Sequence, residues 1–359
     1  MPKTGTSSIQ EALYYGLCDP DFVYCGFGEI NGSYALSALV GADNYIASIR
    51  RLAGGADAYR RRMLARFRRT VERARARGAE LILSAEFCYF WGRQEHQTLR
   101  ELAHQHGLDL QFVVYLRPPL DWLASALAQN LKFALITTHA DLLQYCSPAV
   151  IGHRLDFCQR LELLAEFYGR NAITVRPFLR QELAEGCVVR DFCRVVGITR
   201  PPGRIDLQNE GLSLAACQCL HLRNLALGRP LRGAWELVRR DALLVRLEQL
   251  YRDQPVLRLQ AAMLGAAEPV LRQQLADLRQ RHGLALPLTT AAADGGLASL
   301  DSLLELPPEA HRRLLAVAGG DGTPQQALAR LERRPAVAPL LRSARKLVRR
   351  ELRHRRVGC

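Results

Sequence analysis

Residues 112–119 read Phe-Val-Val-Tyr-Leu-Arg-Pro-Pro, and this stretch decides the expected fold. The first five residues are apolar, β-branched or aromatic, as in a strand buried on both faces of a sheet. Pro118 and Pro119 end the strand, because proline cannot donate a hydrogen bond to a neighbouring strand. Residues 120–132 then follow a helical pattern. A buried strand that leads directly into a helix indicates a parallel α/β sheet.

The alternation of strands and helices continues on both sides of this stretch. Further strands are expected over 21–27, 81–84 and 172–175, and further helices over 7–17, 57–77, 96–107, 155–168 and 179–196. Strands separated by helices predict a three-layer α/β fold, in which helices cover both faces of a parallel sheet.

Strand signals fade after residue 213, where long Leu/Ala/Arg-rich helical patterns take over. The sequence therefore predicts an α/β domain over 1–212, a mostly helical extension over 213–340 and a basic tail over 341–359.

The positive charge of the chain is concentrated in two segments. Lys and Arg total 49 against 35 Asp and Glu, a net charge of +14. Residues 50–77 carry +9 and residues 342–356 carry +7, so the remainder is close to neutral. Such segments suit anionic partners: nucleotide, anionic polysaccharide, phospholipid or nucleic acid. The alternative is that both segments are solvated helix faces.

Several classes of protein are disfavoured. No run approaches the roughly 18–20 apolar residues of a spanning helix, and no signal-peptide pattern opens the chain. The ten cysteines form no CxxC pair, so no metal site is indicated. We expect a cytoplasmic protein, with contact to an anionic surface or acceptor through the basic tail.

Residues 1–10, MPKTGTSSIQ, combine a lysine, a glycine and hydroxyl side chains just before a helix. Backbone N–H groups at a helix start, with a nearby ammonium, make an anion cradle. The order differs from the nucleoside-triphosphate loop, where the lysine follows the glycine. The alternative is a turn with a good helix cap.

The order Pro-Lys-Thr-Gly-Thr-Ser-Ser over 2–8 resembles the phosphosulfate loop of sulfotransferases that use 3′-phosphoadenosine 5′-phosphosulfate (PAPS). Arg117, at the end of the strand, and Ser125, on the next helix, match the family pair that holds the 3′-phosphate. The resemblance implies a sulfotransferase-like P-loop fold and transfer of a sulfuryl group from PAPS, without a metal, to a hydroxyl or amine, with carbohydrate or glycolipid preferred. It also implies that Lys3 stabilises the leaving phosphate, and that the 5′-phosphosulfate is held by Lys3, Thr4, Gly5, Thr6, Ser7 and Ser8.

Softer similarities extend the resemblance to about residue 215. They are the stretches Leu83–Glu86, Val175–Phe178, Asp191-Phe192 with Gly197-Ile198, and Asn209–Ser213. The catalytic base is expected to be Glu86, at a strand end, or else Glu29, in a Gly-rich loop.

One departure from the family concerns the loop itself. In the family an apolar strand leads into the phosphosulfate loop, whereas here the loop begins at Met1. The first strand is therefore missing, and we expect the natural protein to start upstream. Three other functions stay open: a nucleotide kinase, an inactive or truncated relative, and a protein that binds a nucleotide or polyanion without catalysis. Nucleic acid is disfavoured as a partner, because few aromatic residues accompany the arginines.

Overall fold

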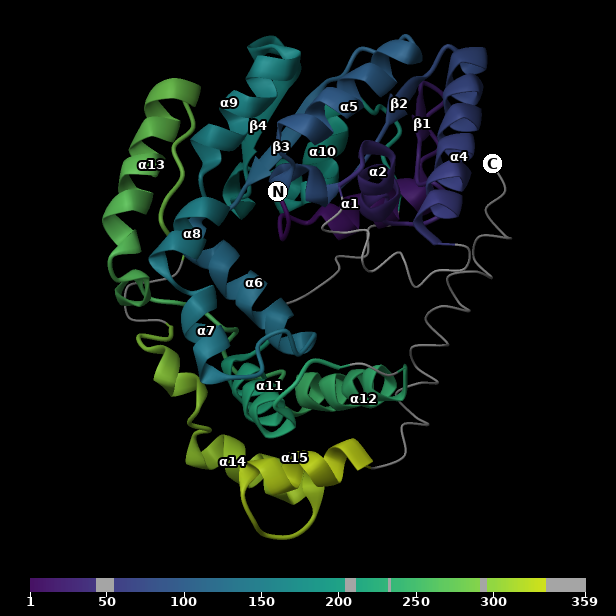
Figure 1. Cartoon of the computed structure of the whole chain (residues 1–359). Helices are drawn as coiled ribbons and strands as arrows, with labels where there is room; N and C mark the ends of the chain where they lie inside the picture. Colours follow the sequence, from purple (N-terminus) through teal and green to yellow (C-terminus); the bar gives the residue numbers. More distant parts are fainter. Residues whose placement is uncertain (43–54, 204–210, 232–233, 291–295, 334–359) are drawn as a thin grey trace. The chain divides into compact units, whose positions relative to one another are not determined.

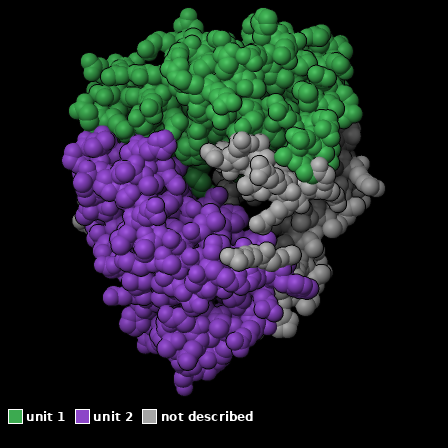
Figure 2. All heavy atoms as spheres, viewed as in Figure 1, with its two compact units in different colours: residues 1–117, 156–209, 273–286 green, residues 118–155, 210–272, 287–359 purple. Residues whose placement is uncertain are grey.

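The computed structural model describes residues 1–42, 55–203, 211–231, 234–290 and 296–333. The chain is mixed α/β, mostly helical, with two small parallel sheets (Figure 1). It divides into two compact units, coloured separately in Figure 2. Unit 1 consists of residues 1–117, 156–209 and 273–286, and unit 2 of residues 118–155, 210–272 and 287–359.

The two units interleave along the chain, whereas the expected domains are separated by one cut near residue 212. Residues 118–155, expected in the α/β domain, belong to unit 2, and residues 273–286 of the expected extension belong to unit 1. A helical pattern shows that one face is buried but not which element covers it. The expected tail, 341–359, lies outside the described residues.

Four strands of unit 1 pair as two parallel two-stranded sheets. β1 (Phe22–Tyr24) pairs with β2 (Glu80–Ile82), and β3 (Phe112–Leu116) pairs with β4 (Ile173–Pro177). All four strands lie at expected positions, and the parallel pairing agrees with the prediction. The single continuous sheet does not form among the described strands, because β2 and β3 are not paired.

The side chains of β2 and β3 nevertheless meet, since Ile82 and Tyr115 pack in one hydrophobic cluster. The Leu116 carbonyl accepts a hydrogen bond from Phe178 on the β4 side. The Tyr115 carbonyl, on the opposite edge, accepts one from the Met1 backbone nitrogen at 3.1 Å. Parallel strands bond through alternate residues, so Met1 occupies a position where a further parallel strand would pair with β3.

We expect an apolar strand of roughly six residues, fused ahead of Met1, to pair with the edge of β3 that binds the Met1 nitrogen. The fusion should raise the midpoint of thermal unfolding by about 2–4 °C for each kcal/mol gained. A Gly/Ser extension of equal length is the control. Equal midpoints for the two fusions, measured by calorimetry, would contradict the expectation.

The other elements of unit 1 are helices and turns. They are α1 (Thr6–Gly16), α2 (Ser33–Val40), α4 (Gly55–Arg77), α5 (Arg93–Gln105), α9 (Phe157–Tyr168), α10 (Val188–Val196) and most of α13 (Ala267–His282), with 3-10 turns η1 (Glu86–Phe90), η2 (Arg170–Ala172), η3 (Arg180–Glu182) and η4 (Ala184–Gly186). The expected helix over 179–196 is wrong in its first half. Glu185 and Gly186 have left-handed backbone, with φ of 55° and 63°, so an α-helix cannot continue through them.

Unit 2 is helical in its described residues. Its elements are α6 (Pro119–Lys132), α7 (His139–Tyr145), α8 (Pro148–Arg154), α11 (Leu214–Leu227), α12 (Ala234–Leu250), η5 (Ala261–Leu264), η6 (Leu300–Leu303), α14 (Pro308–Ala318) and α15 (Pro324–Arg333). None of the described helices is both long and apolar enough to cross a membrane.

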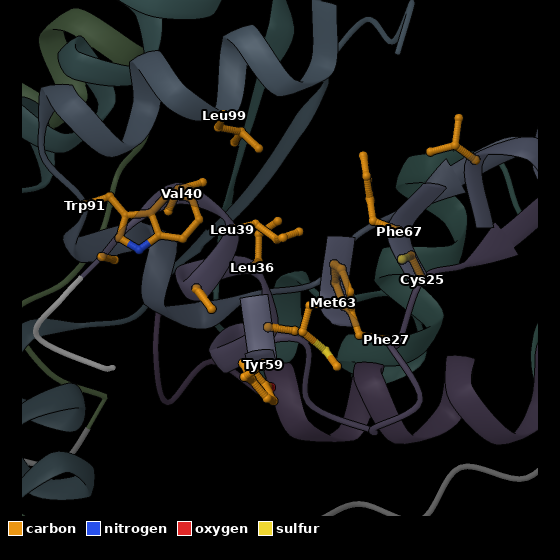
Figure 3. Close-up of a cluster of buried hydrophobic side chains, with 14 residues drawn as sticks. Cys25, Phe27, Leu36, Leu39, Val40, Tyr59, Met63, Phe67, Trp91 and Leu99 are labelled. Atoms are coloured by element: carbon orange, nitrogen blue, oxygen red, sulfur yellow. The ribbon is translucent and has the colours of Figure 1, made fainter. Parts of the chain in front are cut away.

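The core of unit 1 places α4 against α2 and the turn after β1. Tyr59, Met63 and Phe67 lie on one face of α4, and each is at most 2% exposed. They pack in one cluster with Phe27 and Leu36 (Figure 3). This apolar face fixes the helix along its length and turns its remaining faces outward.

Candidate functional site

The loop over residues 1–8 turns sharply into α1. Lys3 and Gly5 both have left-handed backbone, with φ of 65° and 75°. The Gly5 carbonyl accepts hydrogen bonds from the N–H groups of Ser8 and Ile9, at 3.0 and 3.1 Å. The N–H groups that precede Ser8 in α1 belong to the first turn of the helix. N–H groups in a first turn have no hydrogen-bond acceptor inside the helix. They are the kind of donor that binds anions.

Gly5 is required by both conformation and space. A left-handed backbone is strained for a residue with a side chain. A Cβ atom at Gly5 would also lie 2.6 Å from Cγ1 of Val188 and 3.3 Å from the ring of Phe178. The loop therefore packs directly on the start of α10, which holds its backbone close to that helix.

Arg117 connects the end of β3 to this loop. Its guanidinium donates a hydrogen bond to the Lys3 carbonyl at 2.9 Å. The same group lies over the ring of Phe178, 5.7 Å from its centroid, a cation–π contact. The structure thus places the Arg117 guanidinium against the backbone of the loop.

Glu86 lies at the start of η1 after β2 and interacts electrostatically with Lys3. Its backbone N–H donates to Oγ of Ser33 at 3.0 Å, and its side chain is half-buried. Burial raises the pKa of Glu86, while the positive charge of Lys3 acts in the opposite direction. A carboxyl group with a raised pKa next to a cation has the properties of a general base.

Three polar residues that the sequence did not single out lie close to Glu86. Nε2 of Gln10, a buried residue of α1, donates to the Ser84 carbonyl at 3.2 Å and to Oδ1 of Asn31 at 3.4 Å. Oδ1 of Asn31 also accepts the N–H of Ser33 at 2.8 Å. The Asn-Gly-Ser sequence over 31–33 has the composition of a helix start and could have predicted α2.

The other predicted residues are placed differently. Glu29 is exposed. Its N–H donates a hydrogen bond to the Gly26 carbonyl at 2.7 Å, which closes a turn. Burial raises the pKa of Tyr59 of α4, and the negative charge of Glu29 contributes to the rise. Ser125 is half-buried on α6, in unit 2, so its pairing with Arg117 of unit 1 stays a prediction. The Asn209 and Glu210 similarity lies outside the described residues.

Two of the softer similarities meet each other inside unit 1. Asp191 is fully buried and accepts hydrogen bonds from Arg176 at 2.8 Å, Arg194 at 3.0 Å and the Tyr115 hydroxyl at 2.8 Å. Burial acts to raise the pKa of Asp191, but the hydrogen bonds from Arg176 and Tyr115 outweigh it and lower the pKa. This ion pair joins β3, β4 and α10 next to the loop of residues 1–8.

Within the described ranges, no three His, Cys, Asp or Glu side chains are arranged to hold a metal ion. The chain was also compared with known proteins. No protein-family model, curated protein or solved structure matches it. Its function is therefore inferred from the geometry of the loop, Lys3, Arg117 and Glu86.

Proposed function

We propose that this chain is an enzyme that transfers a sulfuryl group from PAPS to a hydroxyl or amine acceptor. One observation carries the proposal. Two residues from separate parts of the sequence contact or act on Lys3 of the loop over residues 1–8: Arg117 through a hydrogen bond, and Glu86 through its charge. The specific sulfotransferase-like P-loop fold is part of this proposal.

The residues of the loop suit the anionic 5′-phosphosulfate group of a nucleotide. Lys3 and Gly5 both have left-handed backbone, a conformation that occurs in anion-binding nests. Lys3 and the hydroxyls of Thr6 and Ser7 add a charge and further donors at the start of α1. Arg117 would hold the 3′-phosphate, and the nucleotide supplies an activated sulfuryl group.

The roles of Lys3 and Glu86 follow from their charges. The Lys3 ammonium would stabilise negative charge that develops on the leaving phosphate oxygen. The Glu86 carboxylate would accept the proton of the acceptor hydroxyl as its oxygen bonds to sulfur and the bond from sulfur to the 5′-phosphate breaks. The products are a sulfate ester and adenosine 3′,5′-bisphosphate.

Calorimetric titration tests whether the chain binds the nucleotide as proposed. We expect adenosine 3′,5′-bisphosphate to bind more tightly than adenosine 5′-monophosphate or ATP with Mg²⁺. Transfer is then measured with labelled PAPS and a panel of saccharides, a glycolipid and a phenol. Tighter binding of ATP would refute the proposal in favour of phosphoryl transfer, and bisphosphate binding without transfer to any acceptor would favour an inactive relative.

Glu86→Gln should lower the transfer rate by about 10²–10⁴-fold, the contribution of a general base, without weakening bisphosphate binding. In the wild type, kcat/KM should rise with pH through a pKa above that of an ordinary glutamate, because burial favours the protonated form and the base must be ionised. Glu29→Gln, at an exposed carboxyl, is the matched control. A larger loss for Glu29→Gln would assign the base to Glu29.

A further inference from the structure

The outward surface of α4 is unusually rich in positive charge. The helix carries nine arginines against Asp57 and Glu72, a net charge of +7 over residues 55–77. Eight of these arginines are exposed: Arg60, Arg61, Arg62, Arg68, Arg69, Arg73, Arg75 and Arg77. We call these eight residues the α4 arginine face.

No residue of the α4 arginine face forms an ion pair with a carboxylate among the described residues. Arginines elsewhere do: Arg281 pairs with Glu162 at 2.5 Å, and Arg313 with Asp253 at 2.9 Å. Even Glu72, one turn from Arg68, Arg69 and Arg75 on the same helix, lies beyond ion-pair distance. Like charges at this density repel one another, and a bound polyanion would relieve the repulsion.

The arginines follow two rows along the helix. Arg61, Arg68 and Arg75 repeat every seven residues, as do Arg62 and Arg69. Seven residues rise about 10.5 Å along a helix axis, so each row presents guanidinium groups at a regular interval. Guanidinium groups bind sulfate and carboxylate groups with two hydrogen bonds at once.

The side chains that accompany the arginines narrow the class of partner. Tyr59 and Phe67, the only aromatic residues of α4, are buried in the core (Figure 3), so no ring is left to stack on a nucleic-acid base. The apolar face of α4 packs in the same core, so α4 has no exposed apolar face that could insert into a membrane.

We propose that the α4 arginine face is a binding surface for an anionic polysaccharide, a linear chain with regularly spaced sulfate or carboxylate groups. The surface adjoins the turn after β1, because Arg66 of α4 donates a hydrogen bond to the Phe27 carbonyl. A polysaccharide held on α4 is therefore held beside the turn that carries Glu29. The proposal concerns binding and stands independently of sulfuryl transfer.

The test uses the full chain and a heparin oligosaccharide of defined length as the probe. The triple variant Arg61→Gln, Arg68→Gln, Arg69→Gln should bind the probe about 10–100-fold more weakly. This range assumes that each ion pair between an arginine and the probe contributes the free energy typical of an exposed ion pair. Glutamine has a helix propensity similar to that of arginine, and circular dichroism checks that each variant is folded. The control triple variant, Arg252→Gln, Arg258→Gln, Arg279→Gln, removes the same charge from exposed arginines outside α4 and should bind as the wild type does.

Three results would overturn the proposal. Equal losses of affinity for the heparin probe in both triple variants would show a general effect of net charge. No loss for the α4 variant would assign the binding elsewhere. A 20-base-pair DNA duplex, or vesicles with anionic lipid, bound more tightly than heparin at the same salt concentration would identify a different class of partner.

Discussion

Asp191→Ala should lower the free energy of unfolding by about 3–5 kcal/mol, the cost of leaving one side of a buried ion pair without its partner. Arg176 and the Tyr115 hydroxyl would lose a shared acceptor inside unit 1. Urea unfolding at pH 7 measures the change. Asp109→Ala, at an exposed carboxyl, is the control, and a loss below 1 kcal/mol for Asp191→Ala would contradict the expectation.

The pH dependence of stability provides a second check on Asp191. Its folded-state pKa is lower than the ordinary value of 3.8, so the unfolded chain takes up this proton more readily. The stabilisation is complete above the ordinary pKa and is lost as the pH falls below it toward the folded-state pKa. The difference in stability between wild type and Asp191→Ala should therefore shrink below about pH 4.

Arg117→Ala should weaken binding of adenosine 3′,5′-bisphosphate by about 2–4 kcal/mol, the range for removing a charge-assisted hydrogen bond from a desolvated site. The substitution removes the cation beside the loop and the hydrogen bond that holds the Lys3 carbonyl. Calorimetric titration measures the change in affinity.

Two further variants make the result on Arg117 interpretable. Arg117→Lys keeps the charge but not the planar fork, so it should recover only part of the affinity. Arg93→Ala, which removes an exposed arginine of α5, should leave the affinity unchanged. Unchanged affinity in Arg117→Ala, at wild-type thermal stability, would show that Arg117 only braces the loop.

Much of unit 1 follows from local sequence. The run over 112–116 has the composition of a buried strand and forms β3 with those bounds, because two prolines and the apolar run act within a few residues. The loop and α1 follow from Gly5 and the hydroxyl residues after it for the same reason. Such signals depend only on neighbours in the sequence.

Features that depend on distant residues were not predictable. The separation into two sheets depends on whether β2 and β3 pair, and these strands are distant from each other in the sequence. The break at Glu185 lies in a helical pattern and is fixed by packing around Asp191, whose carboxylate accepts the Ala184 N–H at 3.1 Å. The contact of Gln10 with Asn31 and Ser84 likewise joins elements that have no sequence relation.

The interleaving of the two units has a consequence for how the protein is made. Unit 1 includes residues 273–286, where Arg281 pairs with Glu162 of α9 at 2.5 Å. A ribosome that has released only residues 1–212 has therefore not yet delivered the part of α13 that belongs to unit 1. Since chains fold as they emerge, unit 1 can be completed only after most of unit 2 has been synthesised. A single truncation of the gene therefore cannot yield either unit on its own.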